Sequence, residues 1–287
     1  MNGDVTDLIV TGASGVVGQN LVRTFADAGF KVLAVSRRRT YFESDNIQTL
    51  TVDSYSQLVQ KLPFVQGASA LFHLAENSDR RIQLDADEIS RMVNFTTELS
   101  QAGAAAGVKR FVYASSLYAE DTNLGPYGAA KKAIEDSLLT QASAMSTQIL
   151  RLPPVYGRGS RGMIQKIAKA VQNGWPLPFA LATRPRSFLA MDNLSDLCIR
   201  LSQSTYRRNA VLVPVDAKLW SLKSMTMAIG EAHKRKARVV PIPFIDAVSP
   251  ATVSDHDRHA CRLRELKTEL SWAPDDRLSR QSLMALR

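Results

Sequence analysis

Short apolar runs alternate with longer amphipathic stretches up to residue 152, and this alternation limits the possible folds more than any other feature of the chain. The runs have the character of strands, and the stretches between them have helical spacing. Alternation of this kind, with mostly apolar strands, predicts a parallel sheet that is covered by helices on both faces. The predicted strands are Asp7–Val10, Lys31–Ser36, Gln48–Val52, Ala68–Leu74, Arg110–Ser115 and Thr147–Leu152, and the clearest helices are Gly15–Ala28, Asp87–Ala106 and Tyr127–Ala142.

The segment Leu8–Gly18, LIVTGASGVVG, places three glycines at intervals of three directly after the first predicted strand. Gly12 permits a tight turn, Gly15 lets backbone N–H groups approach a pyrophosphate, and Gly18 lets the next helix lie close to the sheet. The positive end of that helix favours a bound phosphate. The sequence therefore predicts a dinucleotide cradle, with a chance glycine turn as the alternative.

The rhythm of strands and helices breaks after Pro153, where proline and glycine become frequent, so we expect a second lobe to begin there. The predicted fold is α/β, a Rossmann-type doubly wound parallel sheet with a smaller C-terminal α+β substrate-binding lobe. The expected boundaries are a dinucleotide-binding domain at 1–155, rejoined by about 187–212, and a substrate-binding lobe at 156–186 and 213–287.

Composition excludes several classes of function. The net charge of +9 is diffuse, and its densest clusters, Arg37–Arg39 and His233–Arg238, lack the interleaved aromatic residues of single-strand binders. We therefore expect no nucleic-acid partner, although the positive field helps to attract a polyanionic small molecule. Cys198 and Cys261 match no metal or redox spacing, so no metal site is expected. Reduced thiols, an acidic start and the lack of long apolar runs predict a cytoplasmic protein without a membrane partner.

The G-x-x-G-x-x-G spacing resembles the glycine motif of the extended short-chain dehydrogenase/reductase family, in its group of nucleotide-sugar epimerases, dehydratases and reductases. The resemblance covers most of the chain, and its segments are specific when taken together and in order. They are FHLAEN (72–77), VNFTTEL (93–99), VKRFVYASS (108–116), PYGAAK (126–131), LRLPPVYGRG (150–159), RSFLAMDNLSDL (186–197) and LSWAPDD (270–276).

Tyr127 and Lys131 are four residues apart on a predicted helix, so they share one face. The ammonium can then favour the ionised phenol and make it usable as an acid or base near neutral pH, whereas a pair on a solvated helix surface is the alternative. Ser116, at the end of a strand, can hold a substrate oxygen. The resemblance implies that Ser116 orients the reacting oxygen, that Tyr127 transfers the proton and that Lys131 binds the nicotinamide ribose. The choice of Ser116 over Ser115 rests on the resemblance.

The resemblance extends the expected site to further residues. Arg186 resembles an arginine that contacts the substrate's diphosphate, with a solvent-facing charge as the alternative, and Arg258 is the candidate for a second such arginine. His73 is expected to be a packed strand histidine, since no second metal ligand stands at a useful spacing. The full expected cofactor site is Gly12, Ser14, Gly15, Val16, Val17, Gly18, Ser36, Arg37, Arg38, Asp53, Ser54, Leu74, Ala75, Asn94, Tyr127, Lys131 and Pro153.

The end of the second predicted strand indicates which cofactor is bound. NAD sites place a carboxylate there to bind the ribose 2′-hydroxyl, whereas the 2′-phosphate of NADP requires cations. Ser36, Arg37 and Arg38 occupy this position. NADP(H) is therefore favoured, and an NAD(H) site with solvated arginines is the alternative.

The predicted function is an NADP(H)-dependent nucleotide-sugar oxidoreductase that reduces the C4 ketone of a UDP- or dTDP-4-keto-6-deoxyhexose. A reductase exchanges its cofactor at every turnover, which suits NADPH. The alternatives are a UDP-sugar 4-epimerase with tightly bound NAD, a reductase of a small non-sugar carbonyl, and a non-catalytic NADP(H)-sensing protein. Dehydratases of this group carry an Asp-Glu pair after the active-site hydroxyl residue, and Leu117 and Tyr118 stand there instead.

The loop between Ser116 and Tyr127 departs from the family. Only ten residues, LYAEDTNLGP, separate Ser116 from Tyr127, whereas sugar-modifying relatives usually have a longer loop.

The helices predicted at Asp87–Ala106 and Tyr127–Ala142 resemble those that form a four-helix contact in homodimers of this family. A homodimer is therefore expected. The alternative is that the apolar faces of these helices only cover the sheet.

Overall fold

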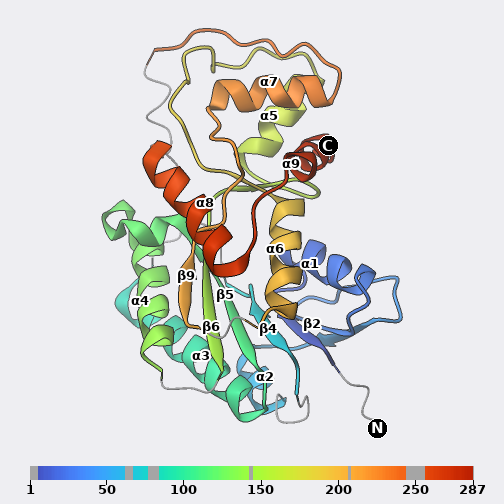
Figure 1. Cartoon of the computed structure of the whole chain (residues 1–287), viewed down its shortest axis with the longest axis vertical. Coiled ribbons are helices and arrows are strands. Elements are labelled where there is room, and N and C mark those ends of the chain that lie inside the picture. Colours follow the sequence, from blue (N-terminus) through green and yellow to red (C-terminus); the bar gives the residue numbers. More distant parts are fainter. Residues whose placement is uncertain are drawn as a thin grey trace. The chain divides into compact units, whose positions relative to one another are not determined.

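The computed structural model (Figure 1) divides into two compact units. Met1–Arg151 and Cys198–Leu212 form the first unit, and Leu152–Leu197 and Val213–Arg287 form the second. The assignment of the cofactor to the first unit and of the substrate to the second stays a prediction. The residues that the structure describes are 6–61, 67–76, 84–141, 145–205, 208–243 and 256–286.

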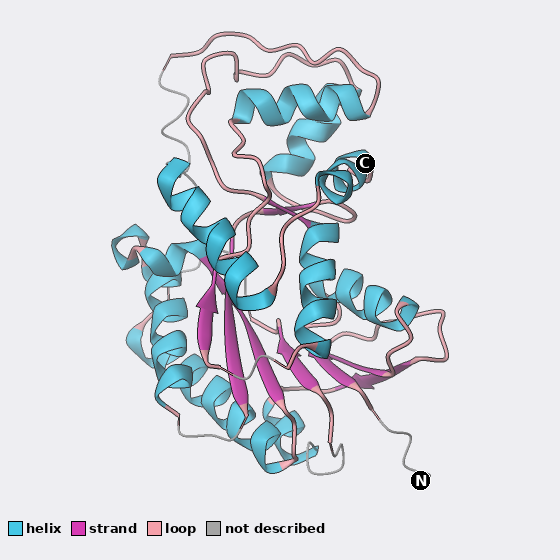
Figure 2. Ribbon diagram, in the orientation of Figure 1, coloured by secondary structure: helices cyan, strands magenta, loops and turns pink. Residues whose placement is uncertain are grey.

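The first unit is built on a seven-stranded sheet with the order β3-β2-β1-β4-β5-β6-β9. Figure 2 draws the strands in magenta. β1 pairs in parallel with β2 and β4, and the pairs β2–β3, β4–β5 and β6–β9 are also parallel. This sheet confirms the predicted doubly wound α/β fold. Its strands are β1 (Leu8–Thr11), β2 (Val32–Ser36), β3 (Ile47–Thr51), β4 (Ala70–His73), β5 (Arg110–Ser116), β6 (Ser146–Leu152) and β9 (Ala210–Leu212).

Helices cover both faces of this sheet. On one face, Ile9 of β1 and Leu71 of β4 belong to a buried cluster that includes residues of α2, α3 and α4. On the other face, Phe25 of α1 packs on Phe72 of β4, with ring centroids 4.9 Å apart. Neighbouring strand residues therefore serve opposite layers, which explains why the strands are apolar throughout. The helices of this unit are α1 (Val16–Asp27), α2 (Ser56–Lys61), α3 (Ala86–Ala105) and α4 (Pro126–Thr140), together with the 3₁₀ turns η2 (Leu117–Glu120) and η3 (Thr122–Leu124).

The strand order places a topological switch point beside β1. The chain builds β1, β2 and β3 outward in one direction and then returns to add β4 on the other side of β1. Ligands of open α/β sheets bind at the carboxyl ends of the strands where the order reverses. A site is therefore expected in the segments that follow β1, β4 and β5.

The second unit contains a short parallel pair, β7 (Val155–Tyr156) and β8 (Leu189–Ala190). Buried Asp216 accepts hydrogen bonds from the Tyr156 hydroxyl at 2.7 Å and from the Ala190 N–H at 2.9 Å, which ties both strands to one carboxyl. Burial raises the pKa of Asp216 above its usual range, although these hydrogen bonds oppose the rise. Its helices are α5 (Met163–Gln172), α7 (Leu222–Ala232), α8 (His256–Leu270) and α9 (Asp276–Met284), and α6 (Met191–Gln203) passes from the second unit into the first.

No helix within the described ranges has both the length and the apolar character that a bilayer span requires.

His73 is a buried histidine at the end of β4. Its Nδ1 lies 2.7 Å from the Thr11 hydroxyl, and its ring stacks against Phe111 and Tyr113 with centroids 6.0 and 6.1 Å away. Burial disfavours the imidazolium and lowers the pKa of His73 to about 4, although the charge of Glu76 opposes the shift. The folded protein therefore holds this ring neutral.

The neutral His73 ring makes the stability of the fold depend on pH. As the pH drops from 6.5 to 4, the free energy of unfolding is expected to fall by up to about 3 kcal/mol, because His73 is protonated in the unfolded chain and stays neutral in the folded chain. The contribution is complete above pH 6.5 and is lost toward pH 4. His73→Phe keeps a ring for stacking and should remove this slope, whereas His256→Phe, which alters an exposed ring, should keep it. Urea unfolding at a series of pH values measures both, and an unchanged slope in His73→Phe contradicts the assignment.

Candidate active site

The glycine turn after β1 leaves no room for side chains. Gly12 has a φ of 73°, and a Cβ on it would lie 2.7 Å from the backbone carbonyl carbon of Leu74. A Cβ on Gly18 would overlap the carbonyl oxygen of Gly12 and lie 2.9 Å from the Cα of Ala13. Backbone therefore packs directly against backbone here, which confirms the close approach that the spacing predicts.

The first turn of α1 follows this glycine turn. Gly15 is its N-cap, and no side chain within the described ranges caps the helix. Ser14, Val16 and Val17 are half-buried around the exposed Gly15. A helix leaves its first N–H groups without intrahelical partners, and together with the helix dipole they attract an anion. The turn therefore fits the pyrophosphate of a dinucleotide.

The carboxyl end of β2 is neutral at Ser36 and cationic directly after it. Ser36 is buried and donates a hydrogen bond of 2.5 Å to the Arg38 carbonyl, while Arg37 and Arg38 are exposed. The Arg37 guanidinium lies 5.9 Å from the centroid of the Tyr55 ring, and the Tyr55 hydroxyl accepts a hydrogen bond of 3.2 Å from the Gly12 N–H. The cationic loop and the glycine turn are thus linked through Tyr55.

The remaining expected cofactor residues of the first unit lie at several places. Leu74 and Ala75 are half-buried directly after β4 and border Gly12. Asp53 and Ser54 are exposed after β3, where the Asp53 carboxylate accepts a hydrogen bond of 3.1 Å from the Gln57 side chain. Asn94 is exposed on α3.

The two serines at the end of β5 have different partners. Ser115 donates to the buried Glu135 carboxylate, which also accepts hydrogen bonds of 3.0 and 2.6 Å from the Arg151 guanidinium. Ser116 accepts a hydrogen bond of 3.3 Å from the Tyr118 N–H and caps η2. Ser115 therefore helps to hold α4 against the sheet, which leaves Ser116 as the serine that can serve a substrate.

Tyr127 lies in the first turn of α4. This helix begins with Pro126 at its first position, after Gly125 with a φ of 130°. Gly128 packs against the Tyr118 carbonyl so closely that a Cβ would lie 3.1 Å from its carbon. The short connection is therefore tightly folded, and the half-buried Tyr127 ring meets the Tyr118 ring edge-on with centroids 6.1 Å apart.

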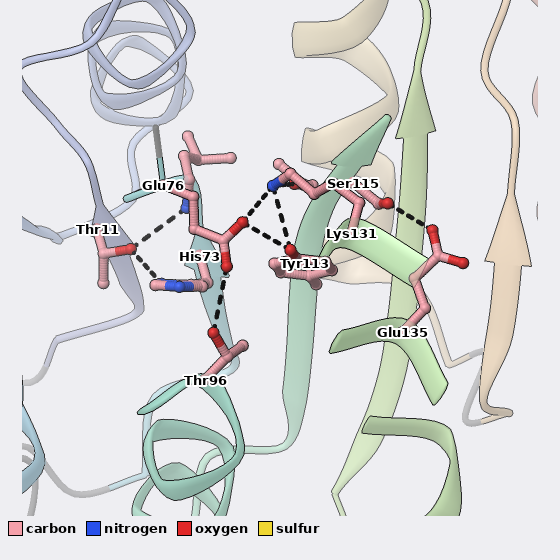
Figure 3. A network of polar contacts seen from close by, with 10 residues as sticks. Thr11, His73, Glu76, Thr96, Tyr113, Ser115, Lys131 and Glu135 are labelled. Atoms are coloured by element: carbon pink, nitrogen blue, oxygen red, sulfur yellow. Dashed lines mark hydrogen bonds and ion pairs between the residues drawn. The ribbon is translucent and has the colours of Figure 1, made fainter. Parts of the chain in front are cut away.

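Lys131 is buried beneath Tyr127, with its Nζ 6.0 Å from the centroid of that ring. The ammonium donates hydrogen bonds to the Ala114 carbonyl at 2.9 Å and to the Tyr113 hydroxyl at 3.1 Å, and it forms an ion pair with Glu76. Figure 3 shows this network, in which Glu76 lies between His73 and the ammonium. Acid–base chemistry at Tyr127 therefore has a cation nearby, and that cation has an acidic partner of its own.

Electrostatics define the protonation states of this network. Burial by itself raises the pKa of Glu76, but the charge of Lys131, together with the hydrogen bonds from Lys131 and Tyr113, outweighs burial and holds the pKa below its usual range. The pKa of Tyr113 lies well above its usual range because burial and the negative charge of Glu76 disfavour its phenolate. Glu76 is therefore a carboxylate, and Tyr113 is a neutral hydrogen-bond donor to it at 2.7 Å.

Comparison with known proteins identifies this arrangement. The model of the NAD dependent epimerase/dehydratase family matches residues 8–211, which include the glycine turn, Ser116, Tyr127 and Lys131. The chain belongs to this family. It is an NAD(P)-dependent enzyme of the extended short-chain dehydrogenase/reductase type, as the sequence predicts.

Relatives in and around the epimerase/dehydratase family differ in their reactions. A UDP-glucose 4-epimerase of Vibrio cholerae is 25% identical over 259 residues, which cover 83% of this chain and 79% of that protein. The structure of MoeE5 in complex with UDP-glucuronic acid and NAD is also 25% identical, with a TM-score of 0.74 over 97% of each chain. A ceramide reductase of Caulobacter vibrioides is 29% identical over 168 residues, which cover 56% of this chain and 51% of that protein.

The expected residues of the second unit lie before β7, before β8 and on α8. Pro153 and Arg186 are buried, and the backbone of Arg186 pairs with that of Trp220 at 2.7 and 3.1 Å. Arg258 is exposed on α8. One turn later, Arg262 is buried and donates a hydrogen bond of 3.2 Å to the hydroxyl of Ser187, the residue after Arg186.

Sequence reasoning therefore missed Glu76, Tyr55 and Arg262. Glu76 follows the FHLA segment directly but is 55 positions from Lys131, so its contact with the lysine carried no sequence signal. Tyr55 and Arg262 carried no signal, because their contacts depend on how distant segments pack. The homodimer predicted through α3 and α4 stays a prediction.

Proposed function

We propose that this enzyme reduces the C4 ketone of a UDP- or dTDP-linked 4-keto-6-deoxyhexose and uses NADP(H) as its cofactor. The observation that carries the proposal is the end of β2, where a buried serine is followed by three exposed arginines and no carboxylate stands to repel a 2′-phosphate. A reductase must release NADP and bind a new NADPH at every turnover, so a cofactor that exchanges freely suits net reduction.

In the proposed reaction, each residue near the carboxyl ends of the strands has a separate role in cofactor binding or proton transfer. The turn from Gly12 to Gly18 binds the pyrophosphate, and Arg37 and Arg38 bind the 2′-phosphate. The nicotinamide, when bound, supplies a hydride to the carbonyl carbon. Tyr127 delivers a proton to the oxygen that becomes the C4 hydroxyl, and Ser116 donates a hydrogen bond to that oxygen. The Lys131 ammonium stabilises the phenolate that remains on Tyr127.

Arg37→Ala is expected to weaken NADPH binding roughly 10- to 100-fold and NADH binding less than about threefold, because the variant loses a charge-assisted contact to the 2′-phosphate only. Titration of cofactor fluorescence measures both dissociation constants. Arg39→Ala removes the same charge two residues away and should leave the preference unchanged. Equal losses for the two cofactors in Arg37→Ala would refute the NADP(H) assignment.

The nucleotide part of the proposed substrate is inferred from relatives and from the second unit. The epimerase of Vibrio cholerae is named for UDP-glucose, and MoeE5 was solved with UDP-glucuronic acid. In this chain, Arg186 and Arg262 are two buried arginines of the second unit. Arg262 donates a hydrogen bond to Ser187, the residue next to Arg186, so the two arginines belong to one region. We propose that these arginines bind the diphosphate, with Arg262 in the place expected for Arg258.

A UDP-sugar 4-epimerase with tightly bound NAD is the second candidate. Two matches of 25% identity that span most of this chain favour it, because one is named as a 4-epimerase and the other was solved with NAD. Tyr127 and Ser116 would serve the same oxygen in that reaction, with Tyr127 first removing and then returning the proton.

The test uses the purified full chain and three mixtures. NADPH with UDP-4-keto-6-deoxy-N-acetylglucosamine, or with dTDP-4-keto-6-deoxyglucose, should lose nicotinamide absorbance in step with alcohol formation. UDP-glucose without added cofactor should stay unchanged. Conversion to UDP-galactose, with stoichiometric NAD released on denaturation, would instead establish the epimerase. If neither ketone oxidises NADPH, the assignment as a reductase is overturned.

Two further controls address the remaining alternatives. A reductase of small non-sugar carbonyls, which the partial match to a ceramide reductase favours, would turn over without inhibition by UDP. An NADP(H)-sensing protein would bind NADPH and turn over none of these compounds.

A further inference from the structure

Glu76 occupies the centre of the polar network and belongs to none of the predicted sites. Its Oε2 accepts hydrogen bonds from the Lys131 ammonium and from the Tyr113 hydroxyl, and its Oε1 accepts a hydrogen bond of 3.2 Å from Thr96 (Figure 3). Its side chain is 9% exposed. A carboxylate with three donors and so little solvent is fixed in position.

The contacts of Lys131 use the full hydrogen-bonding capacity of its ammonium. An ammonium has three N–H donors, and here they are directed to Glu76, to the Tyr113 hydroxyl and to the Ala114 carbonyl. The side chain of Lys131 is 5% exposed. These three acceptors together hold the ammonium 6.0 Å from the centroid of the Tyr127 ring, and Glu76 is the charged one among them.

Among the described residues around Lys131 and Tyr127, Glu76 is the carboxylate that offsets the charge of Lys131. On β4, His73 is held neutral, and on β5 Tyr113 is a neutral phenol. On α4, Glu135 is bound by the Arg151 guanidinium of β6, so those two charges compensate each other. On η2, Tyr118 contributes an aromatic edge, and the charge of Glu120 acts on Arg151. The net charge that Tyr127 experiences is therefore set by how much of the ammonium's field Glu76 cancels.

We propose that Glu76 is a positioning residue for Lys131 that reduces the positive charge Lys131 presents to Tyr127 and so sets the pH at which Tyr127 releases its proton. The inference rests on the proposed role of Tyr127 as the proton donor. A carboxylate that serves only as a counter-ion for folding would stabilise the protein without affecting Tyr127.

The decisive variant is Glu76→Gln, which keeps the shape of the side chain and removes its charge. With the ammonium no longer offset, Tyr127 should ionise at a lower pH than in the wild type, because an uncompensated positive charge favours the phenolate. Near-ultraviolet phenolate absorbance of the cofactor-free protein measures this when the spectrum of the same protein carrying Tyr127→Phe is subtracted. Glu98→Gln removes an exposed charge on α3 and should leave the titration unchanged.

Turnover provides a second readout. The pH at which reduction falls to half its maximum on the alkaline side should move down in Glu76→Gln by the same amount as the titration. Glu76→Asp keeps the charge but draws it away from the ammonium, so it should show a smaller shift in the same direction. If Glu76→Gln is too unstable to titrate, Glu76→Asp decides the question.

A lower Tm with an unchanged Tyr127 titration in the titratable variant overturns the proposal. Because the titration needs neither substrate nor cofactor, a protein that reduces no nucleotide sugar can still show the shift. Failure of the proposed function and failure of the role of Glu76 are therefore separate results.

Discussion

Tyr127→Phe is expected to lower kcat for the nucleotide-sugar ketone by roughly 100- to 10,000-fold, which is the usual contribution of a positioned proton donor. The substitution removes the hydroxyl that delivers the proton and keeps the ring that packs edge-on against Tyr118. Tm and the dissociation constant of NADPH should therefore change little. Stopped-flow or steady-state absorbance of the nicotinamide measures the rate, and thermal unfolding checks the fold.

Tyr41→Phe is the matched control, since it removes a phenol from a ring that is 82% exposed and should leave kcat unchanged. A Tyr127→Phe protein that retained more than about a tenth of the wild-type kcat would show that another group donates the proton. The product should then be examined again for its configuration at C4.

Gly12→Ala is expected to abolish measurable cofactor binding and to lower Tm. A side chain at a φ of 73° is strained by about 1–2 kcal/mol in itself, and the added Cβ would also lie 2.7 Å from the backbone carbonyl carbon of Leu74. The end of β1 and the segment after β4 would have to separate, which moves the N–H groups that face the pyrophosphate. Fluorescence titration with NADPH measures the loss.

Gly29→Ala separates the two causes, because Gly29 has a φ of 88° and a Cβ there would meet no atom within 4 Å. It carries the same kind of backbone strain without the close approach. Its Tm should fall modestly while the NADPH dissociation constant stays at the wild-type value. Similar cofactor affinities in the two variants would mean that contact with Leu74 plays no part in shaping the cradle.

The sheet could be predicted because its signals are local. Each predicted strand up to Thr147–Leu152 corresponds to one of β1 to β6, and the glycines that follow β1 are where backbone meets backbone. Apolar runs, turn residues and helical spacing each act within a few residues, so one sequence is sufficient to read them. The same applies to Tyr127 and Lys131, whose spacing alone places them on one face of α4.

The polar partners of the site could not be predicted, because they depend on packing between distant segments. Glu76 meets Lys131 across 55 positions of sequence, and Tyr55 meets Gly12 across 43. On α8, Arg258 and Arg262 are one turn apart in a helix rich in charge, so periodicity gave no reason to expect only Arg262 to be buried. Ser115 and Ser116 differ in sequence context by a single position, and their roles are separated by the contact of Ser115 with Glu135 and of Ser116 with the Tyr118 N–H.

The last strand of the large sheet is added late. The chain leaves the first unit after Arg151 and re-enters it at Cys198, and only then does β9 pair with Gln148–Leu150 of β6. A nascent chain on the ribosome therefore exposes β6 as an open edge until the second unit has been partly synthesised, and open edges invite pairing with other chains. A fragment that ends at Arg151 would keep the glycine turn, Ser116, Tyr127 and Lys131, yet it would aggregate through that uncapped strand.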